Sequence, residues 1–128
     1  MTAFTSAELE YLSQQPIMRF ATASRDGKPD VAPVVFEVDG DDILSAGFDI
    51  TGTVRYRNIE DNPRATLVID DLASVEPWSP RGIKVIGSAS IEIHDGSARF
   101  RISPRVVISW GINDKTPGIP KMERRVVR

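Results

Sequence analysis

The chain has 128 residues, of which 41% are hydrophobic, and its 16 Lys and Arg residues against 18 Asp and Glu residues give a formal net charge of −2. This length fits a single domain, residues 1–128, with a core of its own, and the charge provides no general attraction to nucleic acid or to an anionic membrane. The absence of cysteine excludes disulfides and thiolate chemistry, and the single histidine excludes a histidine-rich metal centre, so an enzyme of this composition would take its reactive group from a cofactor.

A short helix is predicted close to the N-terminus. Thr5 and Glu8 have the spacing of a capping box, which marks the start of a helix. Leu9 and Leu12 form its predicted buried side, and Pro16 ends it. No apolar run is long enough to cross a membrane and no signal-peptide pattern precedes this helix, so we expect a soluble, cytoplasmic protein.

Most of the remaining chain has the composition of short strands. The predicted strands are residues 17–23, 31–38, 43–48, 65–70, 83–93, 99–103 and 106–110. A second short helix is predicted within residues 52–62, which lack alternation and are followed by Pro63. Hairpin turns at Asp26-Gly27 and Asp95-Gly96 make the neighbouring strands antiparallel. The sequence therefore predicts a mainly β fold, a six- to seven-stranded antiparallel barrel with two short helices, followed by a basic tail at about residues 112–128.

One predicted strand is apolar on both of its faces. Residues 31–36 read Val-Ala-Pro-Val-Val-Phe, with no polar position in the alternation. A strand of this kind is covered on both sides, and the barrel interior accounts for only one of them. A partner subunit or a flat ligand would cover the other.

The start of the second helix has the residues that a phosphate needs. Gly52, Thr53 and Arg55 combine free backbone N–H groups, a hydroxyl and a forked cation at the positive end of a helix. Arg57 lies two residues further on and so points to a different side of the helix. The alternative is an ordinary capped surface helix with solvated arginines. His94 is predicted in a turn and receives no role.

The order and spacing of several short motifs resemble those of the pyridoxamine 5'-phosphate oxidase-like split-barrel superfamily. These motifs are residues 19–23, 26–29, 33–34, 55–59, 62–64 and 86–89. Residues 71–83 and 108–111 are similar to a narrower group, the class that depends on the deazaflavin coenzyme F420 and includes the reductase of oxytetracycline biosynthesis. The resemblance extends to about residue 113 and leaves the basic tail unmatched.

The resemblance implies a split β-barrel that forms a homodimer, with a flavin or deazaflavin cofactor at the subunit interface and a small-molecule substrate. It also implies a cofactor-binding set, with no metal ligand and no catalytic side chain. The set consists of Ala32, Pro33, Val34, Val35 and Phe36 along the ring, Phe48 and Asp49 near the ribityl chain, Thr53 and Arg55 at the phosphate, and Arg81. Arg55 replaces the lysine of most relatives, and Val54 replaces a second base.

The resemblance implies an F420-dependent oxidoreductase that reduces a conjugated small molecule by hydride transfer. An FMN-dependent oxidase or reductase of the same fold is the first alternative, and the acidic polyglutamyl tail of F420, which would find a partner in the basic tail, distinguishes the two. A carrier that binds flavin or F420 without turnover is the second alternative. Haem binding is disfavoured because an axial histidine is hard to find, and nucleic-acid binding because the strands lack an exposed aromatic row.

Overall fold

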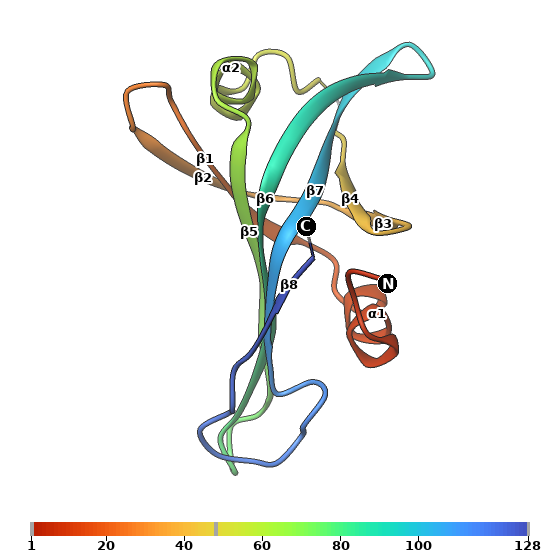
Figure 1. Cartoon of the computed structure of the whole chain (residues 1–128), viewed down its shortest axis with the longest axis vertical. Helices are drawn as coiled ribbons and strands as arrows, with labels where there is room; N and C mark the ends of the chain where they lie inside the picture. Colours follow the sequence, from red (N-terminus) through yellow and green to blue (C-terminus); the bar gives the residue numbers. More distant parts are fainter. Residues whose placement is uncertain (1, 48, 128) are drawn as a thin grey trace.

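The computed structural model describes residues 2–47 and 49–127, which form one antiparallel sheet with two short helices (Figure 1). The helices are α1 (Ser6–Ser13) and α2 (Val54–Asp61). The strands are β1 (Met18–Ala23), β2 (Pro29–Val34), β3 (Glu37–Asp39), β4 (Asp42–Ser45), β5 (Arg64–Ser74), β6 (Ser79–His94), β7 (Ser97–Trp110) and β8 (Glu123–Val126). Their order is β2-β1-β5-β6-β7-β4-β3, and β8 pairs with β7 off this path. The predicted mainly β, split-barrel fold is confirmed. No helix in the described part of the chain has the length and apolar composition needed to span a membrane.

The core lies on one face of the long central strands. Phe20 of β1 is paired with Leu67 of β5, Leu67 with Val85 of β6, and Val85 with Val107 of β7. All four side chains are at most 1% exposed. Because side chains alternate between the faces of a strand, the residues one position away from this row belong to the opposite face.

The prediction for residues 31–38 is wrong in one respect, because the structure divides this strand into β2 and β3. β2 pairs with β1 and β3 pairs with β4, and these pairs stand at opposite ends of the strand order. The chain therefore crosses from one edge of the sheet to the other at Val35 and Phe36. The Ser45 hydroxyl donates a hydrogen bond of 2.7 Å to the carbonyl of Val35 and holds this crossing. β4 ends at Ser45, earlier than predicted.

The two strands predicted on either side of Pro104 form one continuous strand, β7. Gly87 of β6 is opposite Pro104, but its neighbour Ile86 is opposite Val106, so Arg105 is an extra residue in the ladder. The burial pattern of β7 confirms this β-bulge. Its buried residues have even numbers up to Pro104 and odd numbers from Val107 onward, as expected when one extra residue interrupts the alternation. A bulge accommodates the proline, which the sequence alone had placed at a strand end.

We expect that Gly87→Ala lowers the free energy of unfolding by about 1–3 kcal/mol, since a side chain forced into packed space costs about that much. A Cβ at Gly87 would lie 2.1 Å from the backbone oxygen of Ser103, on the bulged strand. Gly52→Ala is the control, because no atom lies within 4 Å of its Cβ position. Urea unfolding of both variants measures the effect, and equal stability of the two would contradict the packing argument.

The N-terminal helix is capped as predicted but buries a different side. Thr5 and Glu8 form the capping box, whereas Leu9 is 39% exposed and does not belong to the buried stripe. Glu8, Tyr11 and Leu12 are the buried residues of α1. A carboxylate can take the place of an apolar residue here because it is fully hydrogen-bonded.

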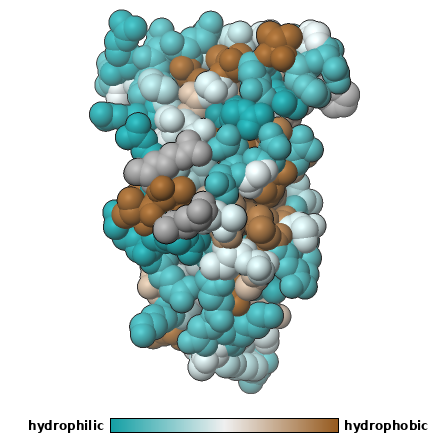
Figure 2. Space-filling model, turned by 45° about the vertical axis from the view of Figure 1, so that its right-hand side comes forward, coloured by the Kyte–Doolittle hydropathy of each residue, from teal (hydrophilic) through white to brown (hydrophobic). Residues whose placement is uncertain are grey.

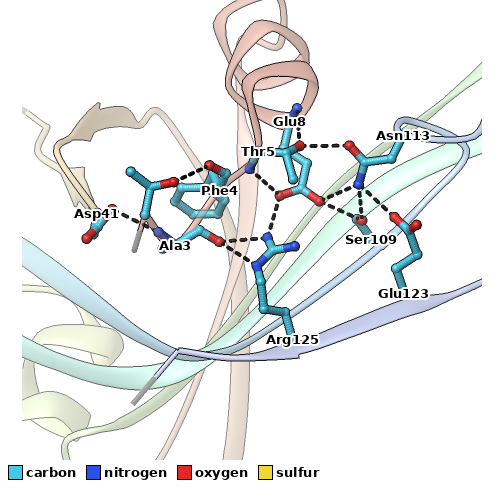
Figure 3. Close-up of polar contacts among 10 residues, drawn as sticks. Ala3, Phe4, Thr5, Glu8, Asp41, Ser109, Asn113, Glu123 and Arg125 are labelled. Carbon is cyan, nitrogen blue, oxygen red and sulfur yellow. Dashed lines mark hydrogen bonds and ion pairs between the residues drawn. The ribbon is translucent and has the colours of Figure 1, made fainter.

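The contacts of Glu8 tie both ends of the chain together (Figure 3). Its Oε1 accepts hydrogen bonds from the Thr5 amide at 3.0 Å and from Arg125 at 2.6 Å. Its Oε2 accepts from Ser109 at 2.8 Å and from Asn113 at 2.9 Å. Arg125 belongs to β8, an element the sequence did not predict, so part of the basic tail is built into the sheet.

Candidate functional site

The cofactor-binding positions predicted on residues 32–36 are divided between two faces. Val35 is 57% exposed, and Pro33 is exposed as well. Val34 is buried in the core, and Ala32 and Phe36 are half-buried against it. A flat ring can therefore contact the side chains of Pro33 and Val35, while Ala32, Val34 and Phe36 can offer backbone groups. β2 is the end strand of the sheet order, so one side of its backbone faces outward.

The first turn of α2 is built as the sequence predicted. Thr53 is the N-cap, and its hydroxyl accepts a 3.2 Å hydrogen bond from the Tyr56 amide and donates one of 2.6 Å to the carbonyl of Ile50. The Thr53 hydroxyl is thus engaged in capping. The Tyr56 ring packs on Phe100, with 6.4 Å between ring centroids, which anchors this turn to the core.

Arg55 has an unusual environment for a surface arginine. Its Nε is buried and has no hydrogen-bond partner within the described residues, whereas Arg57 is exposed. Buried donors are rarely left without an acceptor, so an unpaired one suggests a missing anion or water. The predicted difference in orientation between Arg55 and Arg57 is consistent with this difference in burial.

The connection between β4 and α2 carries the two other predicted contacts. Asp49 is exposed, and its Oδ1 accepts hydrogen bonds from the hydroxyl and the amide of Thr51 at 2.6 and 3.0 Å. These two bonds hold the pKa of Asp49 below its ordinary value. The Asp49 carboxylate therefore stabilises the connection between β4 and α2 in which it lies. Phe48 lies outside the described residues.

Arg81 is not brought to this site within one chain. It forms a two-pronged ion pair with Asp71, at 2.7 and 2.9 Å, and its guanidinium lies 5.0 Å from the centre of the Tyr11 ring. The connection between β5 and β6, close to Arg81, lies at the opposite end of the long strands from α2 (Figure 1). Trp78 in that connection is 53% exposed. Arg81 and Trp78 therefore lie away from Arg55 within one chain (Figure 1).

A pocket of about 310 Å³ adjoins the exposed part of residues 32–36. Val35, Phe36 and Leu44 form much of its apolar lining, and His94 and Arg99 come from the hairpin between β6 and β7. Sequence reasoning missed both hairpin residues, because only the barrel closure brings this hairpin beside residues 35 and 36. Arg99 is paired with Glu92 at 2.6 Å.

A row of mostly apolar residues crosses the sheet face opposite the core, which we call the outer face. Register places one residue of each of six strands in the row. The row consists of Val31, Ala21, Thr66, Ile86, Val106 and Val126. Val31 is 64% and Val126 is 55% exposed. The side of the molecule drawn in Figure 2 shows hydrophobic surface in several separate groups between hydrophilic ones. Exposed apolar rows of this length are typical of surfaces that another chain covers.

Two sequence comparisons relate the chain to known proteins. The sequence profile described as pyridoxamine 5'-phosphate oxidase matches residues 4–123. A protein of Streptomyces rimosus named 5a,11a-dehydrotetracycline/5a,11a-dehydrooxytetracycline reductase is 32% identical in an alignment 127 positions long, which covers 91% of this chain and 89% of the relative.

Solved structures share the fold at lower identity. A heme binding protein from Mycobacterium smegmatis superposes with a TM-score of 0.73 at 15% identity, over 96% of this chain and 59% of that one. A structure named F420 Reductase superposes with a TM-score of 0.58 at 21% identity, over 74% of this chain and 91% of that one. At these identities the likeness concerns the fold alone.

Proposed function

Because the chain belongs to the pyridoxamine 5'-phosphate oxidase family, we propose that it is an oxidoreductase that uses coenzyme F420 to reduce a conjugated small molecule. The observation that carries the proposal is the Nε of Arg55 near the start of α2, which is buried and has no hydrogen-bond partner within the described residues. The helix itself packs against β1 and β2. The name of the Streptomyces rimosus relative, a reductase, supports the reaction type.

The residues fit a phosphorylated ring cofactor. The Nε of Arg55 needs an acceptor, and the α2 N-terminus adds backbone N–H groups and a favourable dipole for a phosphate. The exposed side chains of Pro33 and Val35 provide an apolar surface for a ring. F420, when bound, would supply the hydride.

The chain's own contribution to the reaction is binding, orientation and exclusion of water. The pocket beside Val35 and Phe36, which is mostly apolar but is also lined by Glu37, His94 and Arg99, would hold the conjugated substrate against the ring surface and limit the access of water. No side chain of the site is required as a nucleophile, which agrees with a chain that has no cysteine and one exposed histidine.

Parallel titration of the cofactor-free protein with F420 and with FMN, followed by fluorescence, tests the proposal. We expect F420 to bind more tightly, and the reduced F420 complex to be reoxidised when an acceptor substrate is added. If FMN binds tightly and F420 does not, the protein belongs with the FMN-dependent enzymes. Reduced cofactor that persists with every candidate acceptor would favour the carrier alternative.

We further propose that a second copy of the chain covers the outer face and completes the site. Light scattering at micromolar concentration is expected to give twice the 14.1 kDa mass of one chain. Val31→Glu should shift the protein toward the single-chain mass, because it places a charge in the apolar row. Ile119→Glu, at a position 97% exposed in the tail, should leave the mass unchanged. A wild-type protein with the single-chain mass would contradict the proposal.

A further inference from the structure

A second hollow, whose lining does not include Arg55, lies on the outer face of the sheet. It has a volume of about 450 Å³ and is lined by side chains from β1, β5, β6 and β7. Ala21, Thr66 and Ile86, three members of the apolar row, contribute to the lining, together with the arginines Arg64 and Arg105. The hollow thus combines an apolar surface with two cations.

The β-bulge is what directs Arg105 toward this face. In a regular strand, the neighbours Arg105 and Val106 would point to opposite faces. Here Pro104 and Val107 are both buried, and the two residues between them both face outward, Arg105 being exposed. Bulges of this kind re-aim side chains and are frequent beside functional sites.

Register places Arg64 close to Arg105. Arg64 of β5 is opposite Ser88 of β6, one residue from Gly87, which is opposite Pro104 of β7. The two arginines therefore stand on strands that are two spacings apart, roughly 10 Å between backbones. Long side chains reaching from such positions can contact one small ligand between them.

Neither guanidinium has an acidic partner. Within residues 2–47 and 49–127, the guanidinium groups of Arg64 and Arg105 make no hydrogen bond or ion pair, and the Asn62 side chain accepts its hydrogen bond from the backbone amide of Arg64. By contrast, Arg19 on the same face is paired with Asp70 at 3.0 Å, and Arg101 contacts three carboxylates. The hollow therefore carries two uncompensated positive charges.

In the dimer proposed above, on which this step rests, burying the two unpaired charges would cost free energy. A second chain packed on the apolar row would remove water from the hollow, and a desolvated charge without a counter-charge is strongly unfavourable. An anion in the hollow would offset that cost, and arginine pairs suit carboxylate and phosphate groups because they bind both oxygens of a group.

We infer that Arg64 and Arg105 form a second anion-binding site, which takes the carboxylate or phosphate groups of a small molecule against the apolar surface of Ala21, Thr66 and Ile86. The site is distinct from the one proposed at Arg55. Its ligand is either a free small anion or the acidic tail of the cofactor, and both sources present the same chemistry to the arginines.

Titration of the full-length, ¹⁵N-labelled protein with sodium pyrophosphate, and separately with tri-γ-glutamate, tests the site at constant ionic strength. The Nε–H signals of Arg64 and Arg105 are expected to shift and saturate with at least one probe, and the tighter probe identifies phosphate or carboxylate as the preferred group. Arg64→Gln and Arg105→Gln should each weaken binding by about tenfold, as expected for the loss of one charge-assisted hydrogen bond.

Two controls separate this site from other positive charge on the molecule. Arg57→Gln removes the same charge from an exposed position on α2 and should leave the midpoint of the Arg64 and Arg105 titration unchanged. Arg55→Ala should also leave this midpoint unchanged, although it is expected to weaken the binding of the cofactor. Shifts that never saturate with either probe, or an equal loss of affinity in Arg57→Gln or Arg55→Ala, would overturn the inference.

Discussion

Replacing Glu8 with alanine is expected to lower the free energy of unfolding by about 3–5 kcal/mol, the typical cost of removing one partner of a buried ion pair. The Glu8 side chain is completely buried and accepts hydrogen bonds from four groups (Figure 3). Without it, Arg125 loses its carboxylate partner and Ser109 loses the acceptor of its hydroxyl. Urea unfolding at pH 7 measures the difference.

Two further variants locate the cause of that loss. Glu8→Gln keeps the shape and most acceptors but removes the charge, so we expect a smaller loss. Glu10→Ala, an exposed glutamate on the same helix, should change stability by no more than about 0.5 kcal/mol. If Glu8→Ala were as mild as Glu10→Ala, the contacts of Glu8 would not hold the chain ends together.

Glu8 also predicts how stability depends on pH. Burial alone would raise its pKa, but the hydrogen bonds from Thr5, Ser109, Arg125 and Asn113 together outweigh burial, and the pKa lies below the ordinary value of 4.5. A carboxyl with a lower pKa in the folded state stabilises the fold above its unfolded pKa, and this contribution disappears as the pH falls through the folded value. The stability difference between wild type and Glu8→Gln should therefore be full at pH 7 and narrow below about pH 4.5. A difference that widens on acidification would contradict the sign of the shift.

Replacing Arg55 with alanine is expected to weaken cofactor binding by about ten- to a hundredfold. The buried Nε has no partner within the described chain, and a phosphate at the start of α2 would supply the acceptor. A charge-assisted hydrogen bond contributes about 1.5–3 kcal/mol, which corresponds to this range of affinity. Fluorescence titration of the variant with F420 measures the effect.

Arg57→Ala is the matched control for Arg55. It removes the same group two residues away, where the side chain is exposed, and should cost little affinity. Circular dichroism of both variants should show an unchanged fold. Equal losses from the two substitutions would mean that net charge, and not the position of Arg55, governs binding, while no loss from Arg55→Ala would place the phosphate elsewhere.

Local signals in the sequence were sufficient for the elements whose structure depends on near neighbours. The capping box of Thr5 and Glu8, the cap of α2 at Thr53 and the hairpin turn at Asp95-Gly96 all involve residues within a few positions of one another. The alternation of apolar and polar residues in β6 predicted a strand for the same reason, because successive side chains point to opposite faces whichever strand it pairs with. The motif order was enough to identify the family.

Features that depend on partners distant in the chain were decided by the tertiary structure alone. The sequence places Pro104 at the end of a strand. In the structure Pro104 pairs with Gly87, and the β-bulge beside it turns the Arg105 side chain to the outer face. The sequence assigned Glu8 only to the capping box, but contacts with Ser109 and Arg125, more than a hundred positions away, make it part of the core. Which residues of 31–36 face outward followed only once β2 and β3 paired with strands at opposite ends of the sheet. Short-range patterns specify backbone conformation and alternation, whereas register, burial of charge and the meeting of distant side chains depend on long-range pairing that no single segment encodes.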